Sequence, residues 1–474
     1  MPRSLTEGPI PGVLFRFALP ILYANVLQSL NGSVNSVWVG RYLGEAALTA
    51  TSNANTVMFL LIGAAFGVAL AATILVGQSI GANDIPATKR IVGTSATFFT
   101  GISVAMAVAG LTLCRPLLIA MSTPADSLDL AVAYMRVIFL ALPFLYLYAF
   151  IGAMLRGAGD SKTPFYFMLL SVGLDIALNP VFIFGIGPIP RLGIAGSALA
   201  TFVAQAVSLT ALIRHLYRRR HLLVLHKDEL ALLKVDWSVV GTLVKKGVPM
   251  SAQMLVMSLS GVLMITLVNR FGVDTTAAFG AALQLWNYIQ MPAFAVAMAM
   301  SAMTAQNVGA GKWPRVTRIA RVGVLYNVIL CGGIALAMEL LDAPLFSLFL
   351  PEGSGARVIA SHLNHVVTPS FVFFGVAVAL FGVVRATGAV MAPLVILTIT
   401  LLGVRFPLAE IFLGRYQVDA VWWSFLISSA LSALLAVLYY RYGGWRSAHM
   451  MPAEGSPPAP QAPATPPAEA RSEL

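Results

Sequence analysis

QSIGANDIPATKRI, the stretch at residues 78–91, returns in the second half of the chain as QNVGAGKWPRVTRI at residues 306–319. Six of the fourteen positions are identical, at a constant separation of 228 residues. A second motif, R-x-x-G-x-x-x-x-P, begins at Arg156 and again at Arg385, at nearly the same spacing. One half of the chain is therefore a diverged copy of the other. In an apolar chain, two matched halves indicate a transporter whose substrate lies between them.

The composition indicates a membrane protein. The 474-residue chain is 58% hydrophobic and only 10% charged, whereas a soluble globular domain carries about 25% charged residues. There are too few charges to cover a water-facing surface, so lipid is the expected solvent. The net charge of +11 does not indicate a nucleic-acid partner, because the basic residues lie in short connections between apolar segments.

The apolar segments predict an all-α membrane protein. A spanning helix needs about 20 mostly apolar residues, and six such segments fall in each repeat, so the repeats are parallel. The twelve predicted spans are residues 13–39, 51–76, 91–114, 130–152, 165–187, 193–215, 246–269, 277–302, 319–341, 361–383, 391–414 and 419–442.

The basic residues predict the orientation of the chain. Twenty-two Lys and Arg residues fall on the side of the two termini and six on the other side, so both termini are expected to be cytoplasmic. The predicted organisation is a cytoplasmic segment 1–12, an N-lobe 13–215, a cytoplasmic linker 216–245 on lipid headgroups, a C-lobe 246–442, and a disordered Pro/Ala-rich cytoplasmic tail 443–474.

Asp175 is the sharpest functional candidate, because a charged side chain inside a membrane span is costly. Asn179 follows at i+4 and so shares a helix face with Asp175. Pro180 removes a backbone donor and is expected to kink the helix. A carboxylate in this setting can pick up and release a proton, or hold Na⁺ among neutral oxygens. The alternative is a structural carboxylate that is satisfied by hydrogen bonds between helices.

Other intramembrane polar residues leave alternatives open. Gln28, Asn31 and Asn35 form one polar stripe behind Pro20, which also predicts a kink. This stripe either joins two helices or contacts substrate. In the predicted span 277–302, the residues Gln284, Asn287 and Met291 either line a cavity for organic cations or are ordinary filler.

Arg405 and Glu410 are interpreted as structural charges of the predicted span 391–414. Arg405 is expected to anchor a neighbouring carbonyl, and Glu410 to reach the headgroups. Arg405 falls at nearly the same place in its repeat as Asp175 does in the first.

Motifs of enzymes are missing from the sequence. There is no Walker loop, no Gly-rich nucleotide turn, no Ser-His-Asp arrangement and no set of three metal ligands. We therefore expect no catalytic residues, no metal site and no cofactor, and an ion gradient as the energy source.

These features together resemble the multidrug and toxic compound extrusion (MATE) family, and its DinF-like bacterial branch above all. The resemblance rests on the two six-span repeats, the Q-x-x-G-A and R-x-x-G-x-x-x-x-P motifs, NSVWVGRYLG at residues 35–44, and LNPVFIFG at residues 178–185. It implies a V-shaped, two-lobe antiporter of the bacterial inner membrane that exports organic cations in exchange for H⁺ or Na⁺ by alternating access. We expect a monomer surrounded by membrane lipids.

The resemblance also implies a set of ion-coupling residues in the first repeat. Matched position by position, these are Gln28, Asn35, Tyr134, Asp175, Asn179 and Ser197.

This chain departs from the family pattern at three of these positions. Asn35 stands where the branch usually has an aspartate, and the Asn and Asp of the fifth span are exchanged. One carboxylate therefore replaces two, which favours H⁺ over Na⁺. The alternative function is a flippase for a lipid-linked oligosaccharide, a related fold that would place several arginines along its cleft.

Overall fold

The described part of the chain contains twelve helical segments that are long and apolar enough to cross a membrane. The structure is a computed structural model that describes residues 5–187, 190–351 and 353–450. Within these ranges the regular structure is entirely helical. The prediction of an all-α membrane protein with six spans in each repeat is confirmed.

The first repeat contains six long helices. They are α1 (Ile10–Leu43), α2 (Glu45–Gly81), α3 (Ile85–Ala120), α4 (Ala125–Gly157), α5 (Lys162–Phe184) and α6 (Ile194–Arg218). Asp84 caps α3 by accepting a hydrogen bond from the Ala87 amide at 2.9 Å. Gly44, at φ +86°, turns the chain between α1 and α2, a conformation that side chains disfavour.

The second repeat follows the same order with two interruptions. Its elements are α7 (Trp237–Val268), η2 (Asn269–Phe271), α8 (Val273–Gly309), α9 (Trp313–Leu340), α10 (Asp342–Ser347), α11 (Gly355–Val367), α12 (Ser370–Thr387), α13 (Met391–Leu397), η3 (Thr398–Arg405), α14 (Phe406–Tyr416), α15 (Asp419–Tyr442) and η4 (Gly444–Ser447). Gly272, at φ +91°, makes the turn that corresponds to Gly44.

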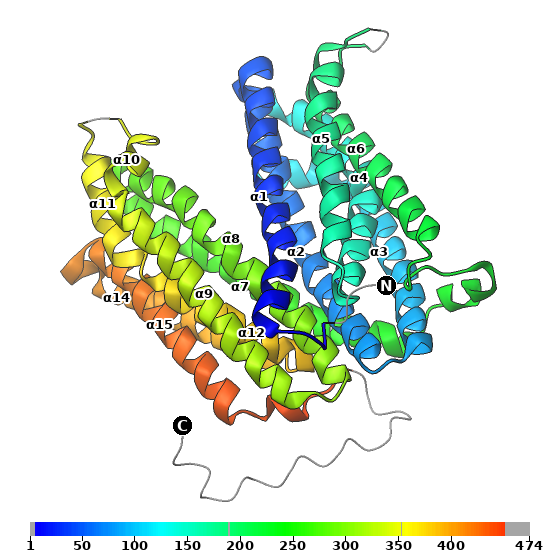
Figure 1. The fold of residues 1–474 in the computed structure, drawn as a ribbon. Coiled ribbons are helices and arrows are strands. Elements are labelled where there is room, and N and C mark those ends of the chain that lie inside the picture. Colours follow the sequence, from blue (N-terminus) through cyan, green and yellow to red (C-terminus); the bar gives the residue numbers. More distant parts are fainter. Residues whose placement is uncertain (1–4, 188–189, 352, 451–474) are drawn as a thin grey trace, which may run out of the picture.

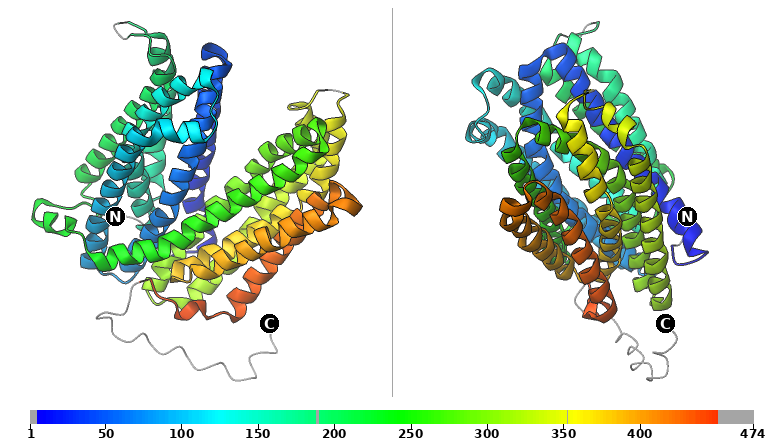
Figure 2. Two further views of the ribbon diagram at one scale, coloured as in Figure 1. Left: turned by 180° about the vertical axis from the view of Figure 1, so that it is seen from behind. Right: turned by 90° about the vertical axis from the view of Figure 1, so that its left-hand side faces the viewer.

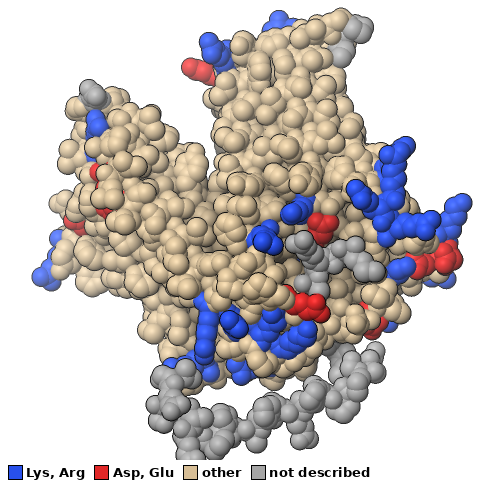
Figure 3. Space-filling model, viewed as in Figure 1, with Lys and Arg blue, Asp and Glu red and all other residues tan. Residues whose placement is uncertain are grey.

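The two repeats form two lobes that lean apart as a V (Figures 1 and 2). The space-filling view shows the surface hollowed between the lobes at the end away from the termini (Figure 3). At the other end the lobes meet, mainly through α2 against α7 and α8, and α1 against α8. We call this end the closed end.

The duplicated Q-x-x-G-A motif forms the seam between the lobes at the closed end. Gln78 Nε2 donates to the Ala386 carbonyl at 2.7 Å, and Gln306 Nε2 donates to the Gly157 carbonyl at 2.8 Å. Gln78 of the N-lobe thus reaches the end of α12 in the C-lobe, and Gln306 of the C-lobe reaches the end of α4 in the N-lobe. The duplicated motif that reveals the two repeats in the sequence therefore also forms hydrogen bonds between the two lobes.

Several helix boundaries differ from the predicted spans. The predicted span 361–383 is two helices, α11 and α12, which are separated near Pro369 because proline has no backbone N–H to continue the helical hydrogen bonds. The predicted span 391–414 contains a π-helical stretch, η3, which periodicity does not reveal. The helix α7 begins at Trp237 rather than at residue 246.

The connection between the lobes packs against the N-lobe. It contains the short 3₁₀ helix η1 (Lys227–Leu233), and Glu229 forms a salt bridge with Lys89 of α3. The Thr97 hydroxyl of α3 donates to the Leu233 carbonyl at 2.8 Å. Its predicted position on lipid headgroups stays a prediction.

The ends of the described chain are anchored at the seam. The Leu5 amide donates to Gln306 Oε1 at 3.0 Å, and Leu5 is only 2% exposed. Trp445 and Met450 are also buried. The prediction of disorder from residue 443 is therefore wrong for residues 443–450, because Trp445 packs on Tyr440; residues 451–474 lie outside the described part.

Candidate functional site

Asp175, a residue of α5, lies buried in the N-lobe where α5 packs against α1 and α6. It is only 2% exposed. A buried carboxylate needs either a cation or several hydrogen-bond donors. The neighbours of Asp175 supply the donors.

The polar stripe of α1 faces Asp175. Asn31 Nδ2 donates to Asp175 Oδ2 at 2.9 Å, and Asn35 Nδ2 donates to the same oxygen at 3.0 Å. The spacing of four residues places both amides on one face of α1. Of the two readings of this stripe, the structure supports a contact between helices at a charged group.

The second carboxylate oxygen is bound from α6 and from α5 itself. Thr201 Oγ1 donates to Asp175 Oδ1 at 3.0 Å. Asn179 Nδ2 donates to Asn35 Oδ1 at 2.8 Å and to the Asp175 carbonyl at 2.9 Å, with a longer contact of 3.4 Å to Asp175 Oδ1. The carboxylate therefore ties three helices together through neutral groups.

No Lys, Arg or His forms a salt bridge with Asp175 within the described ranges. Two buried amide oxygens beside it, Asn31 Oδ1 and Asn179 Oδ1, also have no hydrogen-bond partner there. The cluster thus has one negative charge and spare acceptors, with no fixed cation. Such a cluster can accept a proton without breaking an ion pair.

Three residues expected in this cluster do not hydrogen-bond Asp175. Gln28 is exposed on α1, and Ser197 lies one turn before Thr201, where its carbonyl accepts from Thr201 Oγ1 at 3.4 Å. Tyr134 of α4 is buried within electrostatic range of Asp175 but donates no hydrogen bond to it among the described residues. Thr201 is the hydroxyl that sequence matching missed, by one helical turn.

The two prolines that were predicted to kink a helix lie inside continuous helices. Pro20 is buried within α1, which runs unbroken from Ile10 to Leu43. Pro180 is inside α5, which continues to Phe184. The Pro180 ring removes the amide that would bond the Ile176 carbonyl, next along the chain from Asp175.

The C-lobe carries the opposite charge at the equivalent place. Arg405 Nε donates to Ser428 Oγ at 2.8 Å, and Arg405 Nη2 to Ser429 Oγ at 3.4 Å. The guanidinium lies over the Phe425 ring, 4.4 Å from its centroid. Arg405 therefore binds hydroxyls and a ring of α15, not the carbonyl that was expected.

Glu410 forms a salt bridge with Arg270 at 3.0 Å, and its side chain is 42% exposed. This exposed pair occupies the end of the C-lobe away from the seam. The C-lobe thus contains no acid that corresponds to Asp175 in its described residues.

The three residues of α8 predicted to line a substrate cavity differ in exposure. Gln284 and Asn287 are exposed on α8, and Met291 is half-buried. A separate small cavity of about 40 Å³ lies deeper between the lobes. Its lining includes Phe66, Met250, Met254, Met257, Phe294 and Met298.

Comparison with known proteins places the chain in a family. The family model MatE matches residues 20–181 and 249–411, once in each repeat. The chain belongs to the MATE family. Its relatives include the probable multidrug resistance proteins YoeA and YpnP of Bacillus subtilis. They are 36% and 31% identical to this chain, and the matches cover 90% and 94% of this chain and 92% and 98% of those proteins.

A solved MATE structure shares the fold. It is described as an outward-facing conformation of a multidrug resistance MATE family transporter, with a TM-score of 0.83 and 20% identity over 92% of this chain and 96% of that one. This MATE protein is accordingly a multi-pass membrane transporter and not an enzyme.

The hydroxyl of Thr201 provides a first test of the site. Thr201→Val removes the donor to Asp175 Oδ1 at nearly constant volume, and we expect a loss of about 2 kcal/mol in stability because the lost hydrogen bond is to a charged group. Thermal unfolding in detergent measures it. Thr210→Val is the matched control, because Thr210 is exposed on the same helix and its hydroxyl donates to the Ala206 carbonyl one turn earlier. An equal loss of stability in Ser197→Ala would contradict the assignment of Thr201 as the hydroxyl that binds Asp175.

Proposed function

We propose that this MATE protein exports organic cations in exchange for protons by alternating access, with Asp175 as the coupling acid. The observation that carries the proposal is a single buried carboxylate, held by neutral donors from α1 and α6 and free of any fixed cation in the described structure. The names of the Bacillus relatives, probable multidrug resistance proteins, support the substrate class.

The hydrogen bonds of Asp175 suggest how a proton acts on the lobe. The ionised carboxylate accepts from Asn31 and Asn35, and so holds α1 against α5. A protonated carboxyl group carries an O–H donor in place of one acceptor site, so one amide loses its acceptor. Protonation therefore loosens α1. It also removes the negative charge that attracts a cationic substrate, so proton and substrate oppose each other's binding.

The donor set favours a proton over Na⁺. All the side-chain groups that contact the carboxylate are N–H or O–H donors, whereas Na⁺ binds oxygen atoms. Binding of Na⁺ requires the free oxygens Asn31 Oδ1 and Asn179 Oδ1 to turn toward the ion. A proton needs only Asp175.

Imposed gradients test the proposal in proteoliposomes. With ethidium outside and an acidic lumen, we expect ethidium to accumulate, because protons leave as the cation enters. An equal Na⁺ gradient at constant pH should drive no accumulation. Uptake that follows Na⁺ and ignores pH would contradict proton coupling, and no uptake under either gradient would contradict the antiport itself.

The flippase alternative has one observation in its favour. Arg156 and Arg385 occupy equivalent places in the two lobes, and each lines a small cavity that also includes Phe66. The Nε atoms of both arginines are buried without a partner among the described residues. A thermal shift with a lipid-linked oligosaccharide but none with ethidium would favour the flippase.

The same proposal includes the orientation of the chain in a bacterial plasma membrane. We place both termini in the cytoplasm because twenty-two basic residues lie on their side and six on the other. Figure 3 shows Lys and Arg gathered around the closed end on this face. With this orientation the V opens outward, the state from which a cation is released.

A further inference from the structure

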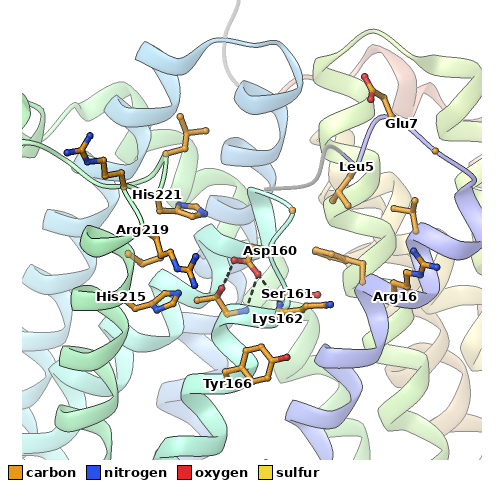
Figure 4. Close-up of a pocket in the computed structure, with 18 residues that line it drawn as sticks. Leu5, Glu7, Arg16, Asp160, Ser161, Lys162, Tyr166, His215, Arg219 and His221 are labelled. Atoms are coloured by element: carbon orange, nitrogen blue, oxygen red, sulfur yellow. Dashed lines mark hydrogen bonds between the residues drawn. The ribbon is translucent and has the colours of Figure 1, made fainter. Parts of the chain in front are cut away.

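A large cavity lies at the closed end on the N-lobe, away from the Asp175 cluster. It has a volume of about 1210 Å³ and lies between the start of α1, the connection from α4 to α5, and the end of α6 (Figure 4). Ligand sites in proteins commonly have volumes of about 300–1,000 Å³, so the cavity has room for a sizeable group. Nothing in the proposed transport cycle uses it.

The cavity is basic. Arg16 of α1, Lys162 of α5, and Arg219 and Arg220 after α6 all line it. None of these four side chains forms a salt bridge within residues 5–187, 190–351 and 353–450. Four cations from three separate segments therefore face one cavity without a carboxylate partner.

The acids of the lining do not neutralise these cations. Asp160 Oδ1 accepts hydrogen bonds from the Lys162 and Thr163 amides, each at 3.0 Å, and Asp160 Oδ2 accepts from Thr163 Oγ1 at 2.6 Å. Asp160 therefore caps the start of α5 (Figure 4). Glu7 lies at the opposite edge of the cavity, beside the start of α1.

His221 adds a neutral donor. Its Nδ1 accepts a hydrogen bond from the Leu223 amide at 3.3 Å, so the proton of the neutral ring is on Nε2. Burial lowers the pKa of His221 and keeps the ring neutral. Nε2 is buried and has no partner among the described residues. An anion in the cavity would provide the acceptor that this N–H lacks.

The cavity adjoins a surface that faces the bilayer. Tyr166, which lines it, is 61% exposed, and one turn further along α5 Leu169 and Leu170 are 49% and 38% exposed. In a chain that spans the membrane these side chains meet acyl chains. Basic pockets between spanning helices at this depth bind anionic lipid headgroups. A soluble phosphate would match the charge but leave the apolar flank unused.

We propose that this cavity binds the phosphate-bearing headgroup of an anionic phospholipid from the leaflet at the closed end. Arg16, Lys162 and Arg219 hold the phosphate, and the acyl chains lie along Tyr166 and Leu169 of α5. A lipid bound here ties the start of α1 to α5 and α6, the same three helices that Asp175 joins deeper in the lobe.

Native mass spectrometry of the purified full-length protein tests this assignment. With equimolar phosphatidylglycerol and phosphatidylcholine, we expect about a tenfold preference for retained phosphatidylglycerol, in keeping with several cations acting on one headgroup. Lys162→Gln with Arg219→Gln should bring the preference close to one. No preference in the wild type, or an unchanged preference in this variant, would overturn the proposal.

Two further arms make the result specific. Lys227→Gln with Lys234→Gln removes the same charge from exposed lysines near η1 and should leave the preference intact; an equal loss there would mean general surface attraction and overturn the site. Inorganic phosphate or glycerol phosphate that displaces phosphatidylglycerol at equal concentration would show a soluble anion site and overturn the lipid assignment. If the double variant does not fold, Arg16→Gln alone should reduce the preference about threefold.

Discussion

Asp175→Asn is expected to abolish proton-driven transport while the fold and the binding of cations persist. Asparagine has nearly the size of aspartate and does not titrate. Its amide oxygen can keep one of the hydrogen bonds that Asn31 and Asn35 now donate at 2.9 and 3.0 Å. Because Asp175 is the only acid in the cluster among the residues that the structure describes, its loss removes the step at which a proton is bound and released.

The measurement is ethidium accumulation in proteoliposomes with an acidic lumen. We expect the initial rate in Asp175→Asn to fall at least tenfold, the equivalent of about 1.4 kcal/mol or more in the coupled step. Ethidium binding without a gradient should weaken much less, since it loses one favourable charge only. A variant that keeps the wild-type dependence on pH would refute the role of Asp175.

Glu410→Gln is the matched control for this experiment. It removes the same charge from a span of the C-lobe, where Glu410 pairs with Arg270 in an exposed salt bridge. Exposed pairs contribute only about 0–1 kcal/mol, so both stability and transport should stay close to wild type. A large loss of transport in Glu410→Gln would mean that replacing any carboxylate in a span disturbs the protein. The loss in Asp175→Asn would then not identify Asp175 as the coupling acid.

The sequence predicted the charged centre of the site better than its surroundings. A buried acid is recognisable because placing a charge inside a membrane is costly and so indicates a function. Asn179 followed from helical spacing, and Asn35 followed from the resemblance to the MATE family. Thr201 was missed because Ser197, one turn earlier on the same face, satisfies the same sequence pattern; only the position of α6 along α5 distinguishes them. Gln28 fits the stripe of α1, yet it lies exposed, since the contact with α5 covers only part of that stripe.

The fold was predictable to the level of spans because apolar length and duplication are both properties of the sequence alone. Helix ends were harder to predict, since helices such as α2 (Glu45–Gly81) continue past the apolar segment at residues 51–76. The π-helical stretch η3, which ends at Arg405, packs against α15, and no periodicity in the sequence reveals it. Burial of Trp445 likewise depends on contacts far away in the chain.

Gly309→Ala is expected to force the two lobes apart where they meet at the closed end. A Cβ atom added to Gly309 would lie 1.9 Å from the Gln78 carbonyl oxygen, and one added to Gly81 would lie 2.0 Å from the Gln306 carbonyl oxygen. The obstacles are backbone atoms, which do not rotate away. The lobes must separate by roughly 1 Å or more to admit one methyl group, and overpacking of this kind costs about 1–3 kcal/mol.

The separation has a conformational consequence. Gln78 and Gln306 donate across the seam at 2.7 and 2.8 Å, and both hydrogen bonds lengthen when the lobes part. We expect Gly309→Ala to lose part of the population that is closed at this end. Spin labels at Glu45 and Val273, the first residues of α2 and α8, should report shorter distances at the open end of the V.

The two glycines should also fail to act independently. One separation of the lobes relieves both clashes, because each motif faces the other across the same seam. Gly81→Ala with Gly309→Ala should therefore lower the stability by less than the sum of the single changes, with a coupling of about 0.5–3 kcal/mol as found for residues in contact.

Gly280→Ala supplies the control on the same helix as Gly309. A Cβ atom there meets nothing within 4 Å, and alanine in a helix interior is favoured over glycine by about 0.5–1 kcal/mol. This variant should be at least as stable as the wild type, with unchanged distances between the labels. Additive losses in the double variant, or an unaltered distance distribution in Gly309→Ala, would mean that the duplicated motif does not hold the lobes together at the closed end.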